Sequence, residues 1–277
     1  NVLVLAPLLA LLAALMGGDS RLLATYTQVF MISLGGFVAK YFPLFLLGAI
    51  FGRLMSDSGS ASTIARSIMS KLGPSQALLS IVLACGVLTY GGVSVFVVVF
   101  ASYPVAVALF RAANTPKRFI PGAILLGGAT FTLSGIPGTP SLQNAIPMPF
   151  FGTDSFAAPG LGSIAGVVML VFGTMWLNGR ARRAAHAGEG YGEHPFDHLD
   201  ASPSPHQPGI VVAVIPLVIV VVVNLVMTWW VIPAMDLGYL AEPKFGRVGV
   251  NDVRGIWALV ASLGLAVVSA IALHWSR

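Results

Sequence analysis

The sequence predicts an all-α protein that crosses a membrane several times. Of its 277 residues, 56% are hydrophobic and only 9% are charged, whereas a soluble domain carries about 25% charged residues. Apolar segments recur along the whole chain, so a signal peptide does not account for them. Two segments are too long for one membrane helix, and each is interrupted by glycine and hydroxyl residues. Such interruptions are typical of solute sites, because freed backbone groups in a membrane must face protein or water.

The charge of the chain indicates membrane topology. The formal net charge is +5, but the basic residues lie in short loops between apolar segments, where the positive-inside rule places them. We therefore expect membrane lipid, and no nucleic acid, as a partner. The single cysteine, Cys85, lies within an apolar run, which leaves neither a disulfide framework nor a cysteine metal site. No cofactor is expected.

The N-terminal quarter contains four apolar or amphipathic stretches. Residues 2–16 form an apolar run that is short for a span of about 20 residues. Because the chain opens inside this run, we expect an N-terminal portion of a longer protein. Residues 22–39 carry several hydroxyl groups and suit an interfacial or re-entrant helix, and 41–55 suit a span. Residues 56–75 predict an amphipathic surface helix stopped by Gly73-Pro74.

The first interrupted segment covers residues 76–110. As one helix it would measure about 52 Å, against a membrane core of about 30 Å. Basic residues flank it on both sides, so an even number of crossings is required. Each half has only about 15 residues, and we therefore expect a re-entrant hairpin with its tip at Tyr90–Ser94. The alternative is a kinked helix that packs through small residues.

The second interrupted segment covers residues 119–151. It holds two prolines and two glycines between Ser134 and Pro140, which will not continue a helix. We expect a discontinuous helix broken from Ser134 to Asn144. The alternative, an extramembrane loop, would place the flanking basic clusters on opposite faces of the membrane.

The remaining elements follow from the same patterns. Residues 160–178 predict a return span, and 210–232 and 255–273 predict two further spans. The polar stretch 179–209, between the return span and the next one, predicts a flexible cytoplasmic linker. Within this linker His194 and His198 have metal-ligand spacing, but Pro195 argues against a helix, and we expect a solvated segment. No histidine stands within a span to activate Ser134, so an intramembrane protease is disfavoured and no enzyme is expected.

Several motifs of the chain resemble the gluconate permease family. They are YFPLFLLG (41–48), DSG (57–59), LTYGGVSVF (88–96), PGTP (137–140), QNAIPMPF (143–150) and AAPGL (157–161). The resemblance implies the architecture of the ion-transporter superfamily, in which two inverted repeats each hold a re-entrant hairpin and a discontinuous helix, commonly in a homodimer. It further implies a multi-pass bacterial inner-membrane permease that imports gluconate or a related small hydroxy acid, usually by proton symport.

The sequence and the resemblance together predict the solute site. The two breaks would meet near the membrane midplane, where backbone N–H groups would neutralise a carboxylate and side chains would bind hydroxyls. The predicted substrate-binding residues are Tyr90, Gly91, Gly92, Ser94, Ser134, Gly138, Thr139, Gln143 and Asn144. Every acidic residue falls in a loop or at a span end, so the coupling ion, H⁺ or Na⁺, has no evident intramembrane carboxylate.

The predicted organisation has four parts. They are N-terminal scaffold helices (1–75), a transport region (76–178), a cytoplasmic linker (179–209) and the opening of a second repeat (210–277). Three functions remain open at this point: a hydroxy-acid symporter, a D-serine or hydroxybutyrate permease of the same fold, and a passive anion pore. An inert membrane scaffold is the fourth alternative.

Overall fold

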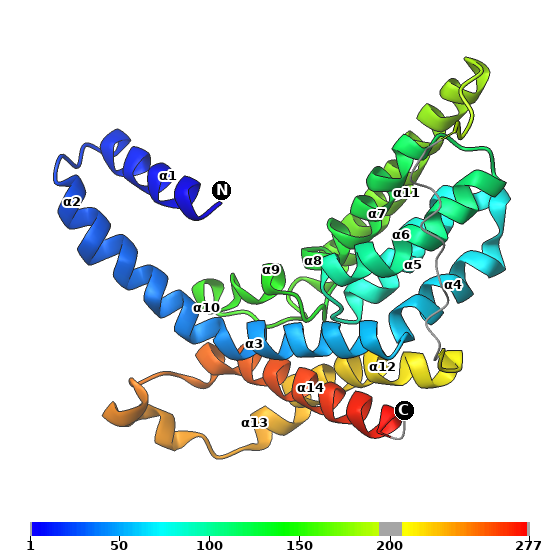
Figure 1. Cartoon of the computed structure of the whole chain (residues 1–277). Coiled ribbons are helices and arrows are strands. Elements are labelled where there is room, and N and C mark those ends of the chain that lie inside the picture. The colour runs from blue at the N-terminus through cyan, green and yellow to red at the C-terminus, as the bar shows by residue number, and fades with distance from the viewer. Residues whose placement is uncertain (1, 194–206, 276–277) are drawn as a thin grey trace. The chain divides into compact units, whose positions relative to one another are not determined.

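A computed structural model describes residues 2–193 and 207–275, and these ranges contain helices and no strand (Figure 1). The all-α prediction is therefore confirmed. The chain divides into two compact units, Asn1–Leu46 and Leu47–Arg277. His194 and His198 lie outside the described residues.

The first unit begins with α1 (Val2–Met16) and continues into a long helix. α2 (Leu22–Ala24), a π-helical turn η1 (Thr25–Phe30) and α3 (Met31–Asp57) form one helical stretch of 36 residues, and α3 extends into the second unit. The sequence predicts separate segments at 22–39 and 41–55, and this division is wrong. Lys40 does not end the helix, and Pro43 is accommodated inside it, as prolines often are in membrane helices.

A helical hairpin follows α3. Its elements are α4 (Ser60–Leu72), a 3₁₀ turn η2 (Pro74–Gln76), α5 (Ala77–Tyr90) and α6 (Val95–Ala112). α4 ends at the predicted stop, where Gly73 has a φ of 71°, and the chain then bends by 102° into α5. α5 and α6 pack on each other, which confirms that 76–110 folds back at Tyr90–Ser94. The 14 residues of α5 rise by about 21 Å, less than a membrane core.

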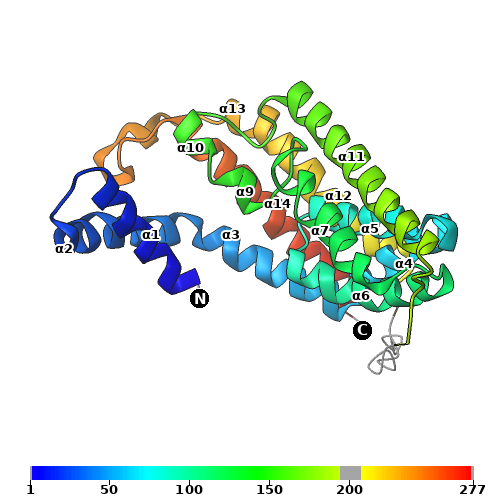
Figure 2. The ribbon, with the colours of Figure 1, turned by 90° about the horizontal axis from the view of Figure 1, so that it is seen from above.

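The second interrupted segment packs against this hairpin. It consists of a 3₁₀ turn η3 (Lys117–Phe119), α7 (Ile120–Gly128), α8 (Phe131–Ser134), α9 (Leu142–Ala145) and α10 (Met148–Phe151). α7 lies along α5 (Figures 1 and 2). They approach so closely that a Cβ at Gly127 would overlap the carbonyl oxygen of Val82. The regular helix ends at Gly128, so the break begins before the predicted Ser134.

α11 (Pro159–His186) runs back along α7 and α5. It extends beyond the predicted start of the linker at 179, because the residues that follow are good helix formers and the arginines among them favour a helix C-terminus. Most of its apolar side chains are exposed, among them Leu161, Phe172 and Trp176. A continuous exposed apolar face of this kind suits contact with lipid.

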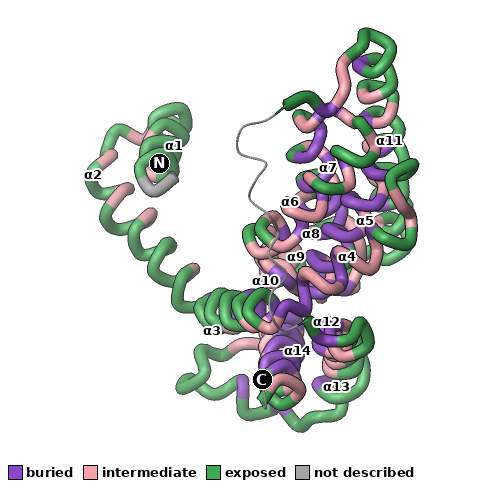
Figure 3. The backbone as a smooth tube through the Cα atoms, turned by 45° about the vertical axis from the view of Figure 1, so that its right-hand side comes forward, coloured by how far each residue is buried: buried purple, intermediate pink, exposed green. Residues whose placement is uncertain are grey.

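The C-terminal helices form a separate layer. It contains α12 (Ile210–Val226), a π-helical turn η4 (Met227–Val231), α13 (Ile232–Ala234), the 3₁₀ turns η5 (Gly238–Ala241) and η6 (Pro243–Phe245), and α14 (Val250–His274). α12 packs along α14 and against α4. In Figure 3 the facing sides of these helices are buried, and so is most of α5.

Five helical stretches of the described residues are long and apolar enough to span a membrane. They are Leu22–Asp57, Val95–Ala112, Pro159–His186, Ile210–Ala234 and Val250–His274. The bent pair α4 and α5 makes a sixth if it is counted as one span. This pattern is that of a multi-pass membrane protein.

Candidate functional site

The first break is a glycine turn at the tip of the hairpin. The N–H of Gly92 donates to the carbonyl of Thr89 (3.0 Å), and the N–H of Val93 donates to that of Leu88 (3.1 Å). This is a Schellman motif, and Gly92 takes its left-handed position with a φ of 91°. The glycines also admit α12, because a Cβ on Gly91 would lie 2.5 Å from Cγ of Leu217.

The second break is stabilised from within by polar contacts. Nδ2 of Asn144 donates to the carbonyls of Thr139 (3.0 Å) and Ser155 (3.1 Å), and the N–H of Gly138 also donates to Ser155 (2.6 Å). The carboxamide of Asn144 therefore uses both of its N–H groups on the protein, and only its oxygen remains for a solute.

Hydroxyl side chains donate hydrogen bonds to the backbone carbonyls that the end of the helix leaves unpaired at this break. Thr130 donates to Leu126 (2.6 Å) and Thr132 donates to Gly127 (2.7 Å). Ser141 donates to the carbonyl of Leu133. Freed carbonyls at a helix end need such partners, so these hydroxyls stabilise the break and are not available to a solute.

The structure brings the two breaks together. The hydroxyl of Tyr90 donates to the carbonyl of Pro137 (2.8 Å), and a Cβ on Gly92 would lie 3.0 Å from Cγ of Pro140. The first and second halves of the predicted site are therefore in direct contact.

Two buried threonine hydroxyls at this junction have no partner in the described part of the chain. Oγ1 of Thr89 faces α7 at Gly128, and Oγ1 of Thr139 lies in the second break. Thr89 is 2% exposed and Thr139 is fully buried. The backbone N–H of Thr139 also lacks a partner among the described residues. A buried polar group without a partner costs about 1–3 kcal/mol, so these groups are the best placed to bind a solute.

The other predicted residues lie differently. Ser94 is the N-cap residue of α6, but its side chain makes no capping hydrogen bond. It faces α3, since a Cβ on Gly52 would lie 3.6 Å from its Cβ. Ser134 and Gln143 are exposed, and in the described structure no hydrogen bond links them to the hairpin tip. The N–H groups of Gly91 and Gly92 bond to carbonyls of α5, and that of Gly138 bonds to the carbonyl of Ser155, so they are not free to neutralise a carboxylate as expected.

Sequence reasoning missed Asn224, which anchors the second break to α12. It is fully buried, and its Nδ2 donates to the carbonyl of Gly138 (3.1 Å) and to Oγ of Ser155 (3.1 Å). The hydroxyl of Thr228, one turn later, donates to Oδ1 of Asn224 (3.4 Å). The signal was present in the sequence, because a carboxamide in a valine-rich span is costly unless it is bonded inside the protein.

A partly exposed ion pair closes the same region. Nη2 of Arg254 lies 3.7 Å from Oδ2 of Asp154, and its Nε donates to the carbonyl of Thr228 (2.8 Å). The loop after α10 is thus tied to both C-terminal helices. Among the described residues no group of three or more His, Cys, Asp or Glu could hold a metal ion.

Comparisons with known proteins identify the family. The model of the GntP family permeases matches residues 2–238. The chain is 39% identical over 287 residues to a protein of Bacillus subtilis (strain 168) described as "Uncharacterized transporter YxjC", covering 99% of this chain and 61% of that protein. It is 30% identical over 145 residues to an "Uncharacterized transporter" of Haemophilus influenzae (strain ATCC 51907 / DSM 11121 / KW20 / Rd), covering 52% of this chain and 32% of that protein.

The chain thus spans less than two thirds of the length of either curated relative. No solved structure matches it. The family match covers most of the chain, including both breaks, and the motifs that resemble gluconate permeases lie within it. The chain belongs to the GntP permease family, a family of membrane transporters.

Proposed function

We propose that the full-length protein is a secondary active transporter that imports gluconate or a related small hydroxy acid by symport with protons, across the inner membrane of a bacterium. The observation that carries this proposal is the junction of the two breaks, where Tyr90 bonds to Pro137 and the hydroxyls of Thr89 and Thr139 have no described partner. Permeases move solutes without transforming them, so the family supports transport instead of catalysis.

The chemistry of the junction suits a hydroxylated anion. Thr139 offers a backbone N–H to a carboxylate and a hydroxyl to a solute hydroxyl, and Thr89 offers a second hydroxyl. The oxygen of Asn144, whose Nδ2 bonds to the carbonyl of Thr139, remains as an acceptor. None of the predicted site residues is acidic, so a carboxylate would meet no like charge from them.

The proposal also includes a coupling ion and an oligomeric state. Protons are the coupling ion that the family resemblance implies, and Na⁺ is the alternative. The resemblance also implies a homodimer.

Uptake by the full-length protein in proteoliposomes tests the proposal. Radiolabelled gluconate, 3-hydroxybutyrate and D-serine are supplied with an imposed pH gradient and, separately, with a sodium gradient. We expect concentrative gluconate uptake that depends on the pH gradient and weakens in Thr139→Val. Uptake that never exceeds equilibrium would indicate a passive pore, and concentrative uptake of D-serine alone would replace the proposed substrate.

A further inference from the structure

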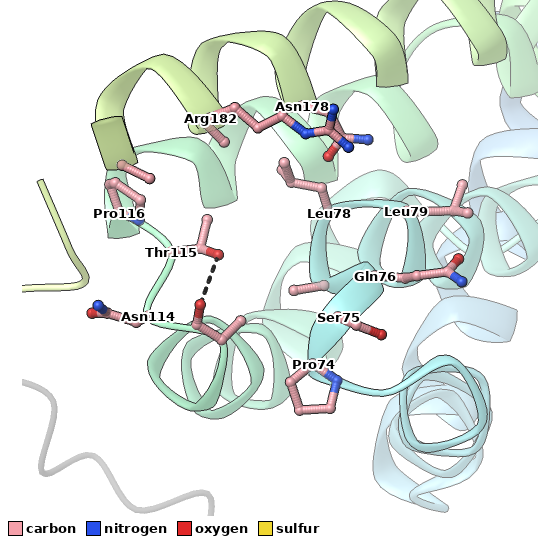
Figure 4. Close-up of a pocket in the computed structure, with 14 residues that line it drawn as sticks. Pro74, Ser75, Gln76, Leu78, Leu79, Asn114, Thr115, Pro116, Asn178 and Arg182 are labelled. Carbon is pink, nitrogen blue, oxygen red and sulfur yellow. Dashed lines mark hydrogen bonds between the residues drawn. The ribbon is translucent and has the colours of Figure 1, made fainter. Parts of the chain in front are cut away.

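A polar cavity of about 400 Å³ lies at the base of the hairpin, at the opposite end of α5 from the glycine turn (Figure 4). Three segments line it: η2 and the start of α5 (74–79), the chain after α6 (113–116) and the last turns of α11 (178–185). It shares no residue with the junction of the two breaks, and the transport proposal makes no use of it.

The cavity carries hydrogen-bond donors that suit an oxyanion. Asn178 and Arg182 stand one turn apart on α11, and Figure 4 shows their polar ends converging above Leu78. Gln76 and Ser75 also line the cavity. A guanidinium with amide and hydroxyl neighbours is a typical setting for phosphate or carboxylate oxygens.

The charge of Arg182 is not balanced by the described parts of the protein. Nearby, Arg118 pairs with Glu189 at 2.7 Å, and Arg180 lies 5.3 Å from the ring centroid of Trp176. No carboxylate among the described residues lies within 4.0 Å of the Arg182 guanidinium. The cavity therefore keeps a net positive character.

The position of the cavity along α11 is that of the lipid headgroups. The apolar stretch of α11 ends where Arg180, Arg182 and Arg183 begin, and basic residues at the ends of spans lie at the membrane surface. Basic pockets between membrane helices at this level bind phosphate-bearing headgroups. A volume of about 400 Å³ falls within the range of small-ligand sites.

We propose that this cavity binds a phosphate group, supplied either by the headgroup of an anionic phospholipid or by free phosphate. Arg182 would pair with the phosphate oxygens, and Asn178 would donate a hydrogen bond to them. Occupation would link the base of the hairpin to α11.

The test measures binding to the full-length protein without any transport assay. In one arm, native mass spectrometry counts phosphatidylglycerol retained from mixed micelles with phosphatidylcholine. In the other, inorganic phosphate is titrated into protein in a neutral detergent and thermal unfolding is followed. The variants are Arg182→Gln and Asn178→Ala, and Arg182→Lys tests whether charge alone suffices.

Arg180→Gln is the matched control, because it removes the same charge from the same helix outside the cavity lining. We expect Arg182→Gln to weaken binding by about fivefold, the effect of one basic group near an anionic surface, while Arg180→Gln binds as the unaltered protein does. Retention of phosphatidylglycerol alone assigns the site to lipid, and stabilisation by phosphate alone assigns it to the free anion. Equal binding by the two glutamine variants, or no binding in either arm, overturns the proposal.

Discussion

The two breaks in the membrane helices are built in different ways. The hairpin tip is closed by backbone hydrogen bonds around Gly92 and by close packing against Leu217. The second break depends on side chains, chiefly the carboxamides of the half-buried Asn144 and the fully buried Asn224. The hydrogen bonds that close the first break therefore come from its own backbone, whereas the second break also takes hydrogen bonds from Asn224 of α12, 86 positions after Gly138.

This difference separates two roles for polar groups near the junction. Several hydroxyls and amides of the second break are used to stabilise it, whereas the buried hydroxyls of Thr89 and Thr139 have no described partner. Substitutions that act on packing, on the internal network, on the unpartnered hydroxyls and on the bond between the breaks should have distinct outcomes.

The largest effect on stability is expected where α7 packs closely on α5. Gly127→Ala would place a methyl group against the carbonyl of Val82 and push α7 away from α5, at a cost of about 3 kcal/mol in folding free energy. Thermal unfolding in detergent measures this loss. Gly48→Ala is the control, because nothing lies within 4 Å of the added atom. Equal stability of the two variants would contradict the close crossing.

The second largest loss of stability is expected when the hydrogen bonds of Asn224 are removed. Asn224→Leu keeps the side-chain size but leaves the carbonyl of Gly138 and the hydroxyl of Ser155 short of a partner, at a cost of about 2 kcal/mol. Uptake should fall with stability. Val222→Leu, on the exposed side of α12, provides the comparison, and if it behaves like Asn224→Leu the network does not stabilise the break.

The unpartnered hydroxyls should affect solute binding and leave stability intact. Thr139→Val removes a buried group without a described partner, so folding should be unchanged or slightly favoured, while KM for the transported acid rises about tenfold. Thr132→Val removes a hydroxyl bonded to Gly127 and should instead lose about 1 kcal/mol of stability with KM unchanged. The reverse pattern would exchange the two roles.

The smallest effect should follow from separating the breaks. Tyr90→Phe removes the hydrogen bond to Pro137, worth about 1 kcal/mol, and should lower the maximal uptake rate by about fivefold. Tyr103→Phe removes a hydroxyl with no described hydrogen bond and serves as control. Identical uptake by both would show that this bond does not couple the breaks.

The location of the first break could be predicted to the residue. Two glycines after Tyr90, in a run too long for one span, leave few other places for the chain to turn. The onset of the second break could not be predicted so closely. Gly128 and Ala129 continue an apolar pattern, and the end of α7 depends on Thr130 and Thr132 bonding back to its carbonyls.

The contact between the two breaks could be predicted from the sequence, and the bond from Tyr90 to Pro137 confirms it. The roles of individual residues could not, because pattern reasoning treated hydroxyls, amides and backbone N–H groups as interchangeable donors. Which of them remain unbonded depends on distant contacts such as Asn224 with Gly138. Such contacts join residues far apart in the chain, and helical periodicity carries no information about them.

The close approach of Gly127 to Val82 has a consequence for the evolution of the family. No side chain larger than hydrogen fits at position 127 while α5 and α7 cross as they do, and this holds whatever solute is carried. Relatives should therefore retain glycine there across changes of substrate. Positions 89 and 139, whose hydroxyls serve no other described bond, are free to diverge, and their variation among relatives should follow the chemistry of the solute.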